Sequence, residues 1–259
     1  MRFDAVVVGG SVAGATAARE LARKGLEVAL VEKARVPRPK ACGEGLLPHG
    51  VAALESMGLL PAGVPVRGLR YVSPSGRTAE ADFPFGRGLV VRRERFDAWL
   101  FEEAAATSGV TAFRETPFDA ESFRARWVVG ADGLRSRFHG RGFTATSPKL
   151  GRVGLSTHVS GLRVDRERVE VLIHAAGEVY LAPSDDDEAL VACLFWEDRL
   201  PEGSNEARVR GVLESLDALA GRRGALTFTT PILGVGPLGL HVEPLLHDGV
   251  VLVGDAAGA

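Results

Sequence analysis

The chain opens with an apolar run, FDAVVV over residues 3–8, which leads into a glycine-rich turn. Alanine and leucine then recur at helical spacing over 12–25, and a second apolar run, EVALVEK, covers 27–33. Short apolar runs rich in β-branched residues predict strands that are buried on both faces. A strand, a tight turn, a helix and a strand within about 30 residues form a βαβ unit. The pattern therefore predicts the start of an α/β domain with a parallel sheet.

The pattern becomes more varied between this unit and residue 133. Apolar residues at one helical face predict an amphipathic helix over 93–109, and a shorter helix is expected over 50–58. RWVVGADG predicts a buried strand that ends at an aspartate between glycines. Alternating apolar and polar residues predict the strands of a small antiparallel layer over 67–73, 78–83 and 88–91.

The next part of the chain reads as an antiparallel sheet. VGLSTHVSGL, VEVLIHA, EVYLAPS and ALVACLFWE alternate apolar with polar residues, and the turn sequences AAG and SDDDE occur between them. This alternation predicts a sheet with one open face. A helix is expected over 204–221 with Ser204 or Asn205 as its N-cap. The buried strand predicted over 249–255 then returns the chain to the parallel sheet.

Composition and charge narrow the class of protein. The chain has 259 residues, 46% apolar and 25% charged, with a formal net charge of −2. These values are typical of a globular protein and give no general reason to expect nucleic acid as a partner. No segment reaches the roughly 18 uninterrupted apolar residues of a membrane span. The two cysteines, Cys42 and Cys193, favour a reducing, cytoplasmic compartment.

The histidines offer no sign of a metal centre. None of the six has metal-ligand spacing to another, so no metal site is expected. We interpret all of them as structural or surface residues: His49, His139, His158, His174, His241 and His247.

The strongest motif for chemistry is GGSVAG, residues 9–14. A G-x-G-x-x-G turn between a strand and a helix lets a dinucleotide pyrophosphate approach the backbone. In this chain Ser11 replaces the middle glycine, and its hydroxyl could donate to a phosphate. Glu32 ends the second strand, where a carboxylate accepts both hydroxyls of an adenosine ribose. The motif and Glu32 together predict a dinucleotide-binding turn.

Two further turns place an aspartate where a buried strand leaves the sheet. They are GADGLRS, which contains Asp132, and GDAAG, which contains Asp255. Ligands of open α/β folds bind at this edge of the sheet, and a carboxylate there can hold ribose or ribityl hydroxyls.

The three motifs together resemble the fingerprints of FAD enzymes of the p-hydroxybenzoate hydroxylase superfamily. Within it, KACGEGLLPHGVAAL (40–54) resembles the segment that follows the second strand in geranylgeranyl reductases. The family pattern matches Lys40, Cys42, Gly43, Gly45 and Leu46. VVRRERFDAWL is also similar to a family motif, through Arg93, Phe96 and Asp97.

The resemblance implies a fold and its division into domains. The fold is α/β: a Rossmann-like FAD-binding domain with a parallel sheet, plus an inserted antiparallel β-sheet substrate domain. The FAD-binding domain would cover 1–150, with 66–90 joining the substrate layer. The antiparallel substrate domain would cover 151–248, and 249–259 would be the return strand of the FAD-binding domain.

The resemblance also implies the cofactor-binding residues. The ADP half of FAD would lie against the first turn and Glu32, Asp132 beside the pyrophosphate, and Asp255 on the ribityl chain. Cys42 and Gly43 would lie near the isoalloxazine, with Arg93 near the cofactor. The full expected set is Gly9, Gly10, Ser11, Ala13, Gly14, Glu32, Lys33, Lys40, Cys42, Gly43, Arg93, Asp132, Gly133, Gly254 and Asp255.

As implied by the resemblance, the expected activity is FAD-dependent oxidation and reduction, with NADPH or NADH as reductant and a hydrophobic small-molecule substrate. One route reduces a prenyl-type C=C bond, with Cys42 or Glu44 as the proton source, since a glutamate beside an apolar cavity suits a general acid. A prenyl-lipid substrate would add a peripheral membrane contact. The second route uses O₂ to hydroxylate an aromatic or polyketide-like substrate.

The sequence also bears on two other functions, a halogenase and a nucleotide-binding module. A halogenase is disfavoured, because the sequence has no tryptophan–x–tryptophan motif and no lysine between Lys40 and Lys149. A nucleotide-binding module without catalysis remains an alternative. The superfamily continues past GDAAG with a loop and a helix, whereas this sequence ends at Ala259. We therefore expect a C-terminally truncated chain that holds FAD poorly; the oligomeric state is left open.

Overall fold

The structure, a computed structural model, describes residues 2–185 and 188–259. It divides into two compact units. The first unit contains 1–38, 94–149 and 239–259, and the second contains 39–93 and 150–238. Residues 39–65 and 91–93, which the sequence assigns to the FAD-binding domain, therefore lie in the second unit. Residues 239–248, assigned to the substrate domain, lie in the first, because β17 (His241–Glu243) pairs with β10 (Thr144–Thr146). Asp186 and Asp187 of the SDDDE turn lie outside the described residues.

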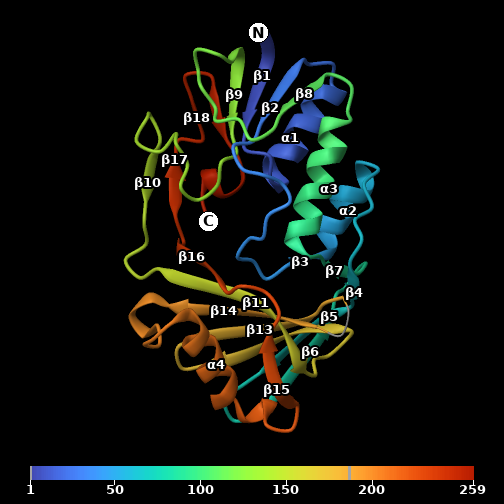
Figure 1. Cartoon of the computed structure of the whole chain (residues 1–259), viewed down its shortest axis with the longest axis vertical. Coiled ribbons are helices and arrows are strands. Elements are labelled where there is room, and N and C mark those ends of the chain that lie inside the picture. The colour runs from blue at the N-terminus through green and yellow to red at the C-terminus, as the bar shows by residue number, and fades with distance from the viewer. Residues whose placement is uncertain (1, 186–187) are drawn as a thin grey trace. The chain divides into compact units, whose positions relative to one another are not determined.

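The first unit is built on a six-stranded sheet in the order β18-β19-β9-β1-β2-β8 (Figure 1). Every pair in it is parallel except β18 with β19. The strands are β1 (Arg2–Val8), β2 (Val28–Val31), β8 (Val110–Phe113), β9 (Arg124–Gly130), β18 (Leu246–His247) and β19 (Val250–Leu252). The parallel α/β sheet is confirmed, and β8 and β18 are additions at its two edges.

Two helices accompany this sheet, α1 (Val12–Arg23) and α3 (Arg93–Ala105). Alanines of α1 are buried because the helix packs directly on the strands, and small side chains permit the close approach. Apolar side chains of β1 and β2 form the core together with three phenylalanines, Phe123, Phe138 and Phe143. The helix predicted over 93–109 ends four residues early, at Ala105, and Gly109 follows with a φ of +89°.

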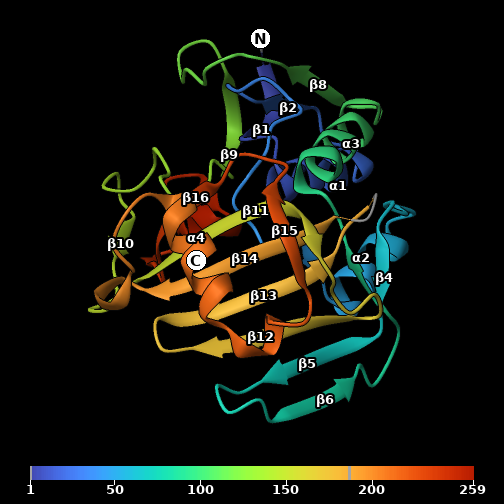
Figure 2. The same ribbon diagram turned by 60° about the horizontal axis from the view of Figure 1, so that its bottom comes forward.

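The second unit is built on an eight-stranded sheet, seen face-on in Figure 2. Its path is β15-β11-β14-β13-β12-β5-β6, with β16 also paired to β11. The strands are β5 (Gly68–Val72), β6 (Thr78–Asp82), β11 (Arg152–Leu162), β12 (Arg168–His174), β13 (Gly177–Pro183), β14 (Ala189–Trp196), β15 (Arg223–Phe228) and β16 (Leu233–Leu238). Only β5 and β12 pair in parallel; the rest are antiparallel.

A smaller layer completes the second unit. It consists of three strands in the order β3-β7-β4 and one helix, α2 (Pro48–Ser56). The strands are β3 (Gly45–Leu46), β4 (Val64–Val66) and β7 (Gly88–Val90). The predicted layer of 67–73, 78–83 and 88–91 is thus divided: β5 and β6 extend the large sheet, and β7 belongs to this smaller one.

The prediction that the antiparallel sheet has one open face is wrong for its centre. Residues 189–193 of β14 are all buried. On one face, Val191, Cys193 and Phe195 pack against α4 (Asn205–Ser215). On the other, Leu190 packs with Val66 and Val90 of the smaller layer. Both faces are covered at the centre of the sheet, so polar residues there, such as Ser156 and His158 of β11, are buried and need partners.

The helix predicted over 204–221 is shorter than expected. Ser204 is its N-cap, since the Ser204 side chain accepts from the Ala207 N–H at 3.2 Å. The helix ends at Ser215, because Leu216 adopts an extended backbone and buries its side chain in the core. A short 3₁₀ turn, Asp217–Leu219, follows.

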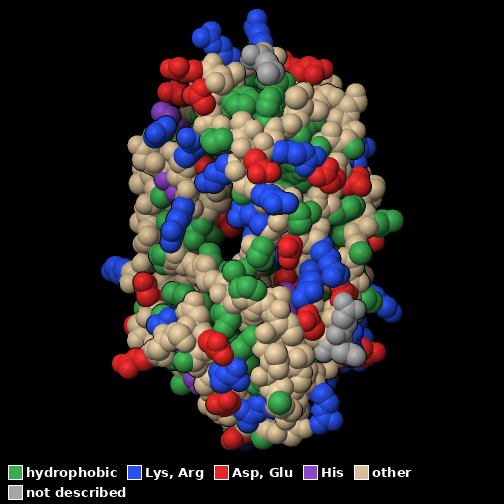
Figure 3. Space-filling model, viewed as in Figure 1, with side chains coloured by type: hydrophobic (Ala, Val, Ile, Leu, Met, Phe, Trp, Pro, Cys, Tyr) green, Lys and Arg blue, Asp and Glu red, His purple; other side chains and the backbone are tan. Residues whose placement is uncertain are grey.

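On the face drawn in Figure 3, lysines and arginines are mixed with aspartates and glutamates, in line with the formal net charge of −2. Within 2–185 and 188–259, no helix combines the length and the apolar character needed to cross a bilayer.

Candidate functional site

The glycine turn between β1 and α1 leaves no room for side chains. Gly9 has a φ of +106°, and a Cβ there would collide with the Ala131 carbonyl. A Cβ on Gly14 would overlap the Gly9 carbonyl oxygen. A Cβ on Gly10 would lie 2.6 Å from the Phe101 ring. These three glycines are required by close backbone packing, which brings the start of α1 to the end of β1.

Glu32 fixes this turn from the end of β2. Its Oε2 accepts from the Gly10 N–H at 2.8 Å, and its Oε1 accepts from the Ala34 N–H at 2.8 Å. The side chain is buried, with the residue 5% exposed. Each carboxylate oxygen has two lone pairs, so each can accept one more hydrogen bond. The carboxylate is thus held rigidly in a form that can still bind two ribose hydroxyls.

Ser11 differs from its predicted role. Its hydroxyl donates to Asp97 Oδ2 of α3 at 2.6 Å, so the hydroxyl proton is directed at a carboxylate and not at a phosphate. Asp97 is buried, and the bond ties α3 to the glycine turn. Asp97, one of the residues that match the family motif, therefore acts on the turn through Ser11. The sequence alone could not indicate this contact.

Asp132, two residues after the end of β9, has one side-chain oxygen without a hydrogen-bond partner among the described residues. Its Oδ2 accepts from the Arg137 N–H at 2.9 Å, whereas its buried Oδ1 has no partner among the described residues. A buried acceptor without a donor costs about 1–3 kcal/mol. A ligand hydroxyl or a phosphate-bridging water at this atom would remove that cost. The neighbouring Gly133 has a φ of +88° and open space around it.

The third turn reaches the same end of the sheet. Gly254 follows β19 with a φ of +59°, and a Cβ there would lie 2.7 Å from Ala13 Cβ. The GDAA segment forms a 3₁₀ turn, and its Ala256 carbonyl lies 2.9 Å from His139 Nε2. Asp255 is exposed.

The first unit therefore gathers three motifs into one cradle. The strands β19, β9 and β1 are sheet neighbours, so their carboxyl ends meet along one edge. The N-terminus of the 12-residue α1 lies there as well, and helix N-termini favour phosphate. The rigid Glu32, the unsatisfied Asp132 and the glycine turns fit FAD. Lys33 is exposed on the strand side of this cradle.

In the second unit, two of the predicted residues, Cys42 and Glu44, contact one face of β11. The Cys42 N–H donates to Ser156 Oγ at 3.1 Å, and Cys42 Sγ accepts from the Glu44 N–H at 3.3 Å. Residues i and i+2 of a strand share a face, so Ser156 and His158 point the same way. The loop that carries Cys42 and Glu44 is docked on that face.

Glu44 is buried and held at both oxygens. Its Oε2 lies 2.9 Å from His158 Nε2, and its Oε1 accepts from the Arg93 N–H at 3.0 Å. Its main-chain carbonyl accepts from the Val91 N–H at 2.9 Å. Glu44 also has a φ of +55°, which is uncommon for a residue with a side chain and is found at functional sites.

Of the histidines interpreted as structural or surface residues, His158 lies in the interior of the second unit and pairs with an ionisable side chain. It is buried, its Nε2 faces Glu44, and its Nδ1 lies 3.4 Å from Thr230 Oγ1. Thr230 Oγ1 also accepts from the His158 N–H at 2.9 Å. Glu44 and His158 are 114 positions apart in the sequence, so the alternating pattern of β11 could indicate the face on which His158 lies but not its partner.

Three other predicted residues have smaller parts in the structure. Arg93 is half-buried and touches Glu44 through its backbone. Gly43 is exposed, with nothing within 4 Å of an added Cβ, so no steric reason requires glycine there. Lys40 is half-buried. The second cysteine, Cys193, is inside the core, where burial raises the pKa of its thiol to about 12.

The fold and the cradle define a flavin-binding protein, and comparison with known families agrees. The chain belongs to the FAD binding domain family, which matches residues 2–65 and 92–259. FAD is its cofactor.

Its relatives narrow the class further. The chain is 32% identical over 301 residues to digeranylgeranylglycerophospholipid reductase 1 of Methanopyrus kandleri, covering 99% of this chain and 74% of the relative. It is 34% identical over 157 residues to geranylgeranyl diphosphate reductase of Rhodobacter capsulatus, covering 53% and 39%. The chain is an FAD-dependent oxidoreductase of the geranylgeranyl reductase-like branch, which confirms the resemblance and the enzyme class.

Solved structures share the fold at low identity. A geranylgeranyl bacteriochlorophyll reductase-like protein of Thermoplasma acidophilum gives a TM-score of 0.79 at 22% identity, covering 99% of this chain and 71% of that one. The flavin-dependent brominase Bmp2 gives 0.83 at 18% identity, covering 99% and 72%. These likenesses concern the fold alone.

Proposed function

We propose that this enzyme reduces a carbon–carbon double bond of a hydrophobic, prenyl-type substrate, with NADPH or NADH as the reductant. The names of the relatives from Methanopyrus kandleri and Rhodobacter capsulatus, both reductases of geranylgeranyl compounds, support the substrate class. When bound, FAD supplies the transfer of hydride between the nicotinamide and the substrate.

The observation that carries the proposal is the buried Glu44–His158 pair. Saturating a C=C bond adds a hydride to one carbon and a proton to the other, so the protein must hold a proton in a dry site. Glu44 Oε2 and His158 Nε2, 2.9 Å apart, can share one exchangeable proton. We assign the donation to substrate carbon to Glu44 and its reprotonation to His158. The Arg93 N–H fixes the other carboxylate oxygen.

Cys42 has a supporting part in the proposal. Its sulfur accepts from the Glu44 N–H, and its own N–H is anchored on Ser156. Both bonds hold the loop that presents Glu44, so Cys42 positions the proton donor.

Exposed apolar side chains beside this loop support contact with a membrane surface, where prenyl lipids reside. Leu47 is 58% exposed, Leu60 74% and Phe85 47%. Leu47 lies between β3 and α2, Leu60 between α2 and β4, and Phe85 between β6 and β7. Single exposed apolar residues are ordinary on proteins, so the argument depends on all three lying in loops that flank the smaller layer.

The test is anaerobic turnover of FAD-loaded protein with NADPH or NADH and geranylgeranyl diphosphate, run in D₂O. We expect one solvent deuterium per reduced bond, and a fall in kcat of about 10²–10⁴-fold for Glu44→Gln, the usual contribution of a general acid. Glu55→Gln, on the exposed side of α2, is the matched control. Oxygen-dependent hydroxylation without anaerobic turnover would identify a monooxygenase instead.

A further inference from the structure

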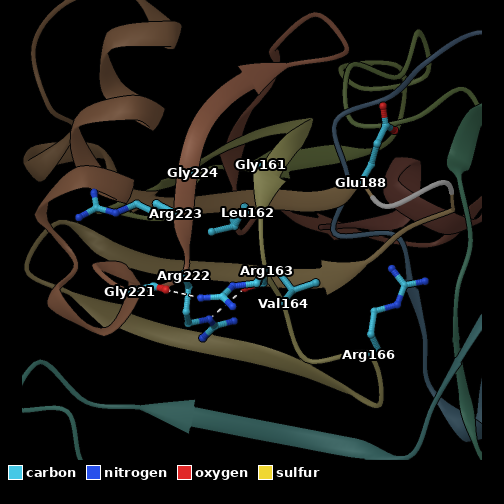
Figure 4. Close-up of a pocket in the computed structure, with 10 residues that line it drawn as sticks. All are labelled: Gly161, Leu162, Arg163, Val164, Arg166, Glu188, Gly221, Arg222, Arg223 and Gly224. Atoms are coloured by element: carbon cyan, nitrogen blue, oxygen red, sulfur yellow. Dashed lines mark hydrogen bonds between the residues drawn. The ribbon is translucent and has the colours of Figure 1, made fainter.

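A cavity whose lining residues are far from Glu44 in the sequence has the chemistry of an anion site. It has a volume of about 680 Å³ and is lined by the end of β11, the loop after it and the start of β15 (Figure 4). Four of its lining residues are arginines: Arg163, Arg166, Arg222 and Arg223. We infer that this cavity binds a phosphate or diphosphate group of a larger ligand.

The positive charge of the cavity is only partly balanced. Arg222 holds the buried Glu170 with two hydrogen bonds, one of them 2.9 Å from Nη1 to Oε1. Glu188 also lines the cavity, but its carboxylate is paired with Arg92 at 2.6 Å. Within the described ranges, the other three arginines have only carbonyl partners, which carry no net charge. The lining is therefore cationic.

The guanidinium groups are held in place with donors to spare. Arg163 donates to the Gly221 carbonyl, and Arg166 donates to the Ser184 carbonyl at 3.2 Å. A guanidinium has five N–H donors, so several remain for a ligand. In Figure 4 the side chains of Arg163 and Arg222 lie together, whereas Arg223 points away from them. Glu170 offsets the charge of Arg222, so an anion in the cavity would be attracted chiefly by Arg163 and Arg166.

Glycines open the backbone of the cavity. The pairing of β11 with β15 shifts register between Ser160 and Leu162, and such a bulge turns the strand away from its partner. Gly161 sits in the bulge with a φ of +79°, and a Cβ there would strike the Ala225 carbonyl. Gly221 has open space within 4 Å of an added Cβ. Gly161 is therefore required by close packing on β15, whereas Gly221 leaves open space next to Arg222.

The class of ligand follows from charge and size. Arginine binds two oxygens of a phosphate at once, which a monatomic anion such as a halide cannot offer. The arginines therefore favour a phosphate. The volume exceeds the needs of one phosphate and falls within the range of roughly 300–1,000 Å³ of small-molecule sites. The ligand is thus a soluble diphosphate compound or a lipid with a phosphorylated headgroup.

The experiment uses the FAD-loaded full chain, so that the cradle of the first unit is already filled. Inorganic diphosphate is titrated by calorimetry into the parent protein, an Arg163→Gln/Arg166→Gln double variant, and Arg77→Gln as the control. Arg77 is exposed on the turn between β5 and β6 of the same unit. Arg222 is left intact because it neutralises Glu170.

We expect saturable binding that weakens with salt. It should fall about tenfold or more in the double variant, since a hydrogen bond to a charged group is worth about 1.5–3 kcal/mol. No saturable binding, or equal loss in Arg77→Gln, would overturn the inference. Flotation with phosphatidic acid vesicles separates the two sources: co-flotation that diphosphate competes away indicates a lipid headgroup, and binding of diphosphate without co-flotation indicates a soluble ligand.

Discussion

The carboxylate of Glu32 offers the most direct test of the flavin cradle, through the substitution Glu32→Gln. Both Glu32 oxygens accept backbone N–H groups, from Gly10 and Ala34, each at 2.8 Å. Glutamine has the same shape but only one acceptor oxygen. In either orientation of the amide, its NH₂ group faces a backbone N–H, so one hydrogen bond becomes a donor–donor contact.

The size of the effect can be worked from this geometry. One buried N–H loses its acceptor, which costs about 1–3 kcal/mol, and the remaining bond loses its charge assistance. The free energy of unfolding should therefore fall by about 2–3 kcal/mol. Affinity for FAD should fall at least about tenfold, because the ribose hydroxyls lose a charged acceptor.

Two measurements separate these effects. Urea denaturation without FAD reports the turn, and titration of the folded protein with FAD, followed by flavin fluorescence, reports the ribose contact. The control is Glu27→Gln, an exposed glutamate at the start of the same strand region. An unchanged FAD dissociation constant in Glu32→Gln would refute the assignment of the ribose site, even if the protein were less stable.

Three further predictions concern the rest of the chain. Gly14→Ala should lower the free energy of unfolding and abolish FAD retention in a binding assay, because its Cβ would overlap Gly9. Another helical glycine, Gly211 of α4, has open space around an added Cβ, so Gly211→Ala should stabilise by about 0.5–1 kcal/mol in urea denaturation. Burial raises the pKa of the Cys193 thiol to about 12 in the folded protein, against an ordinary value of 9.0. As the pH rises, the unfolded chain therefore loses this proton first. Stability should fall by about 1.4 kcal/mol per pH unit between those values, and the slope should shrink in Cys193→Ala; an identical slope would contradict the burial argument. Leu47→Ser/Leu60→Ser should reduce co-flotation with phospholipid vesicles; equal flotation would remove the membrane contact.

The cofactor half of the protein was predictable because its signals are local. The run of 3–8, the glycine turn and the run of 27–33 each specify structure within a few residues, through burial and through the steric demands of glycine. The edge strand β8 was missed, because VTAF is too short to stand out and becomes a strand only by pairing with β2. Local signals also misjudged the helix ends at Ala105 and Ser215.

The proton-holding residues were only partly predictable, because their partners lie far away in sequence. Cys42 was indicated by the resemblance and Glu44 as the other ionisable group of the same loop. Their partners Ser156 and His158 lie 114 residues further on. No spacing rule links a loop to a strand at that separation. The same holds for the arginine cavity, which exists only because β15 pairs with the bulged end of β11.

Cofactor binding and the choice of reaction depend on different residues of this chain. A fold fixes where a cofactor lies, whereas the residues placed around the reacting atoms decide which reaction follows. In this chain the cradle depends on backbone sterics and one carboxylate, features that any FAD enzyme of this fold can share. The Glu44–His158 pair depends on side-chain identity at two positions, and its hydrogen bonds do not involve the glycine turn or Glu32. Substitutions at Glu44 or His158 should therefore change the rate or the type of reaction while leaving FAD affinity intact, and substitutions at Glu32 should do the reverse.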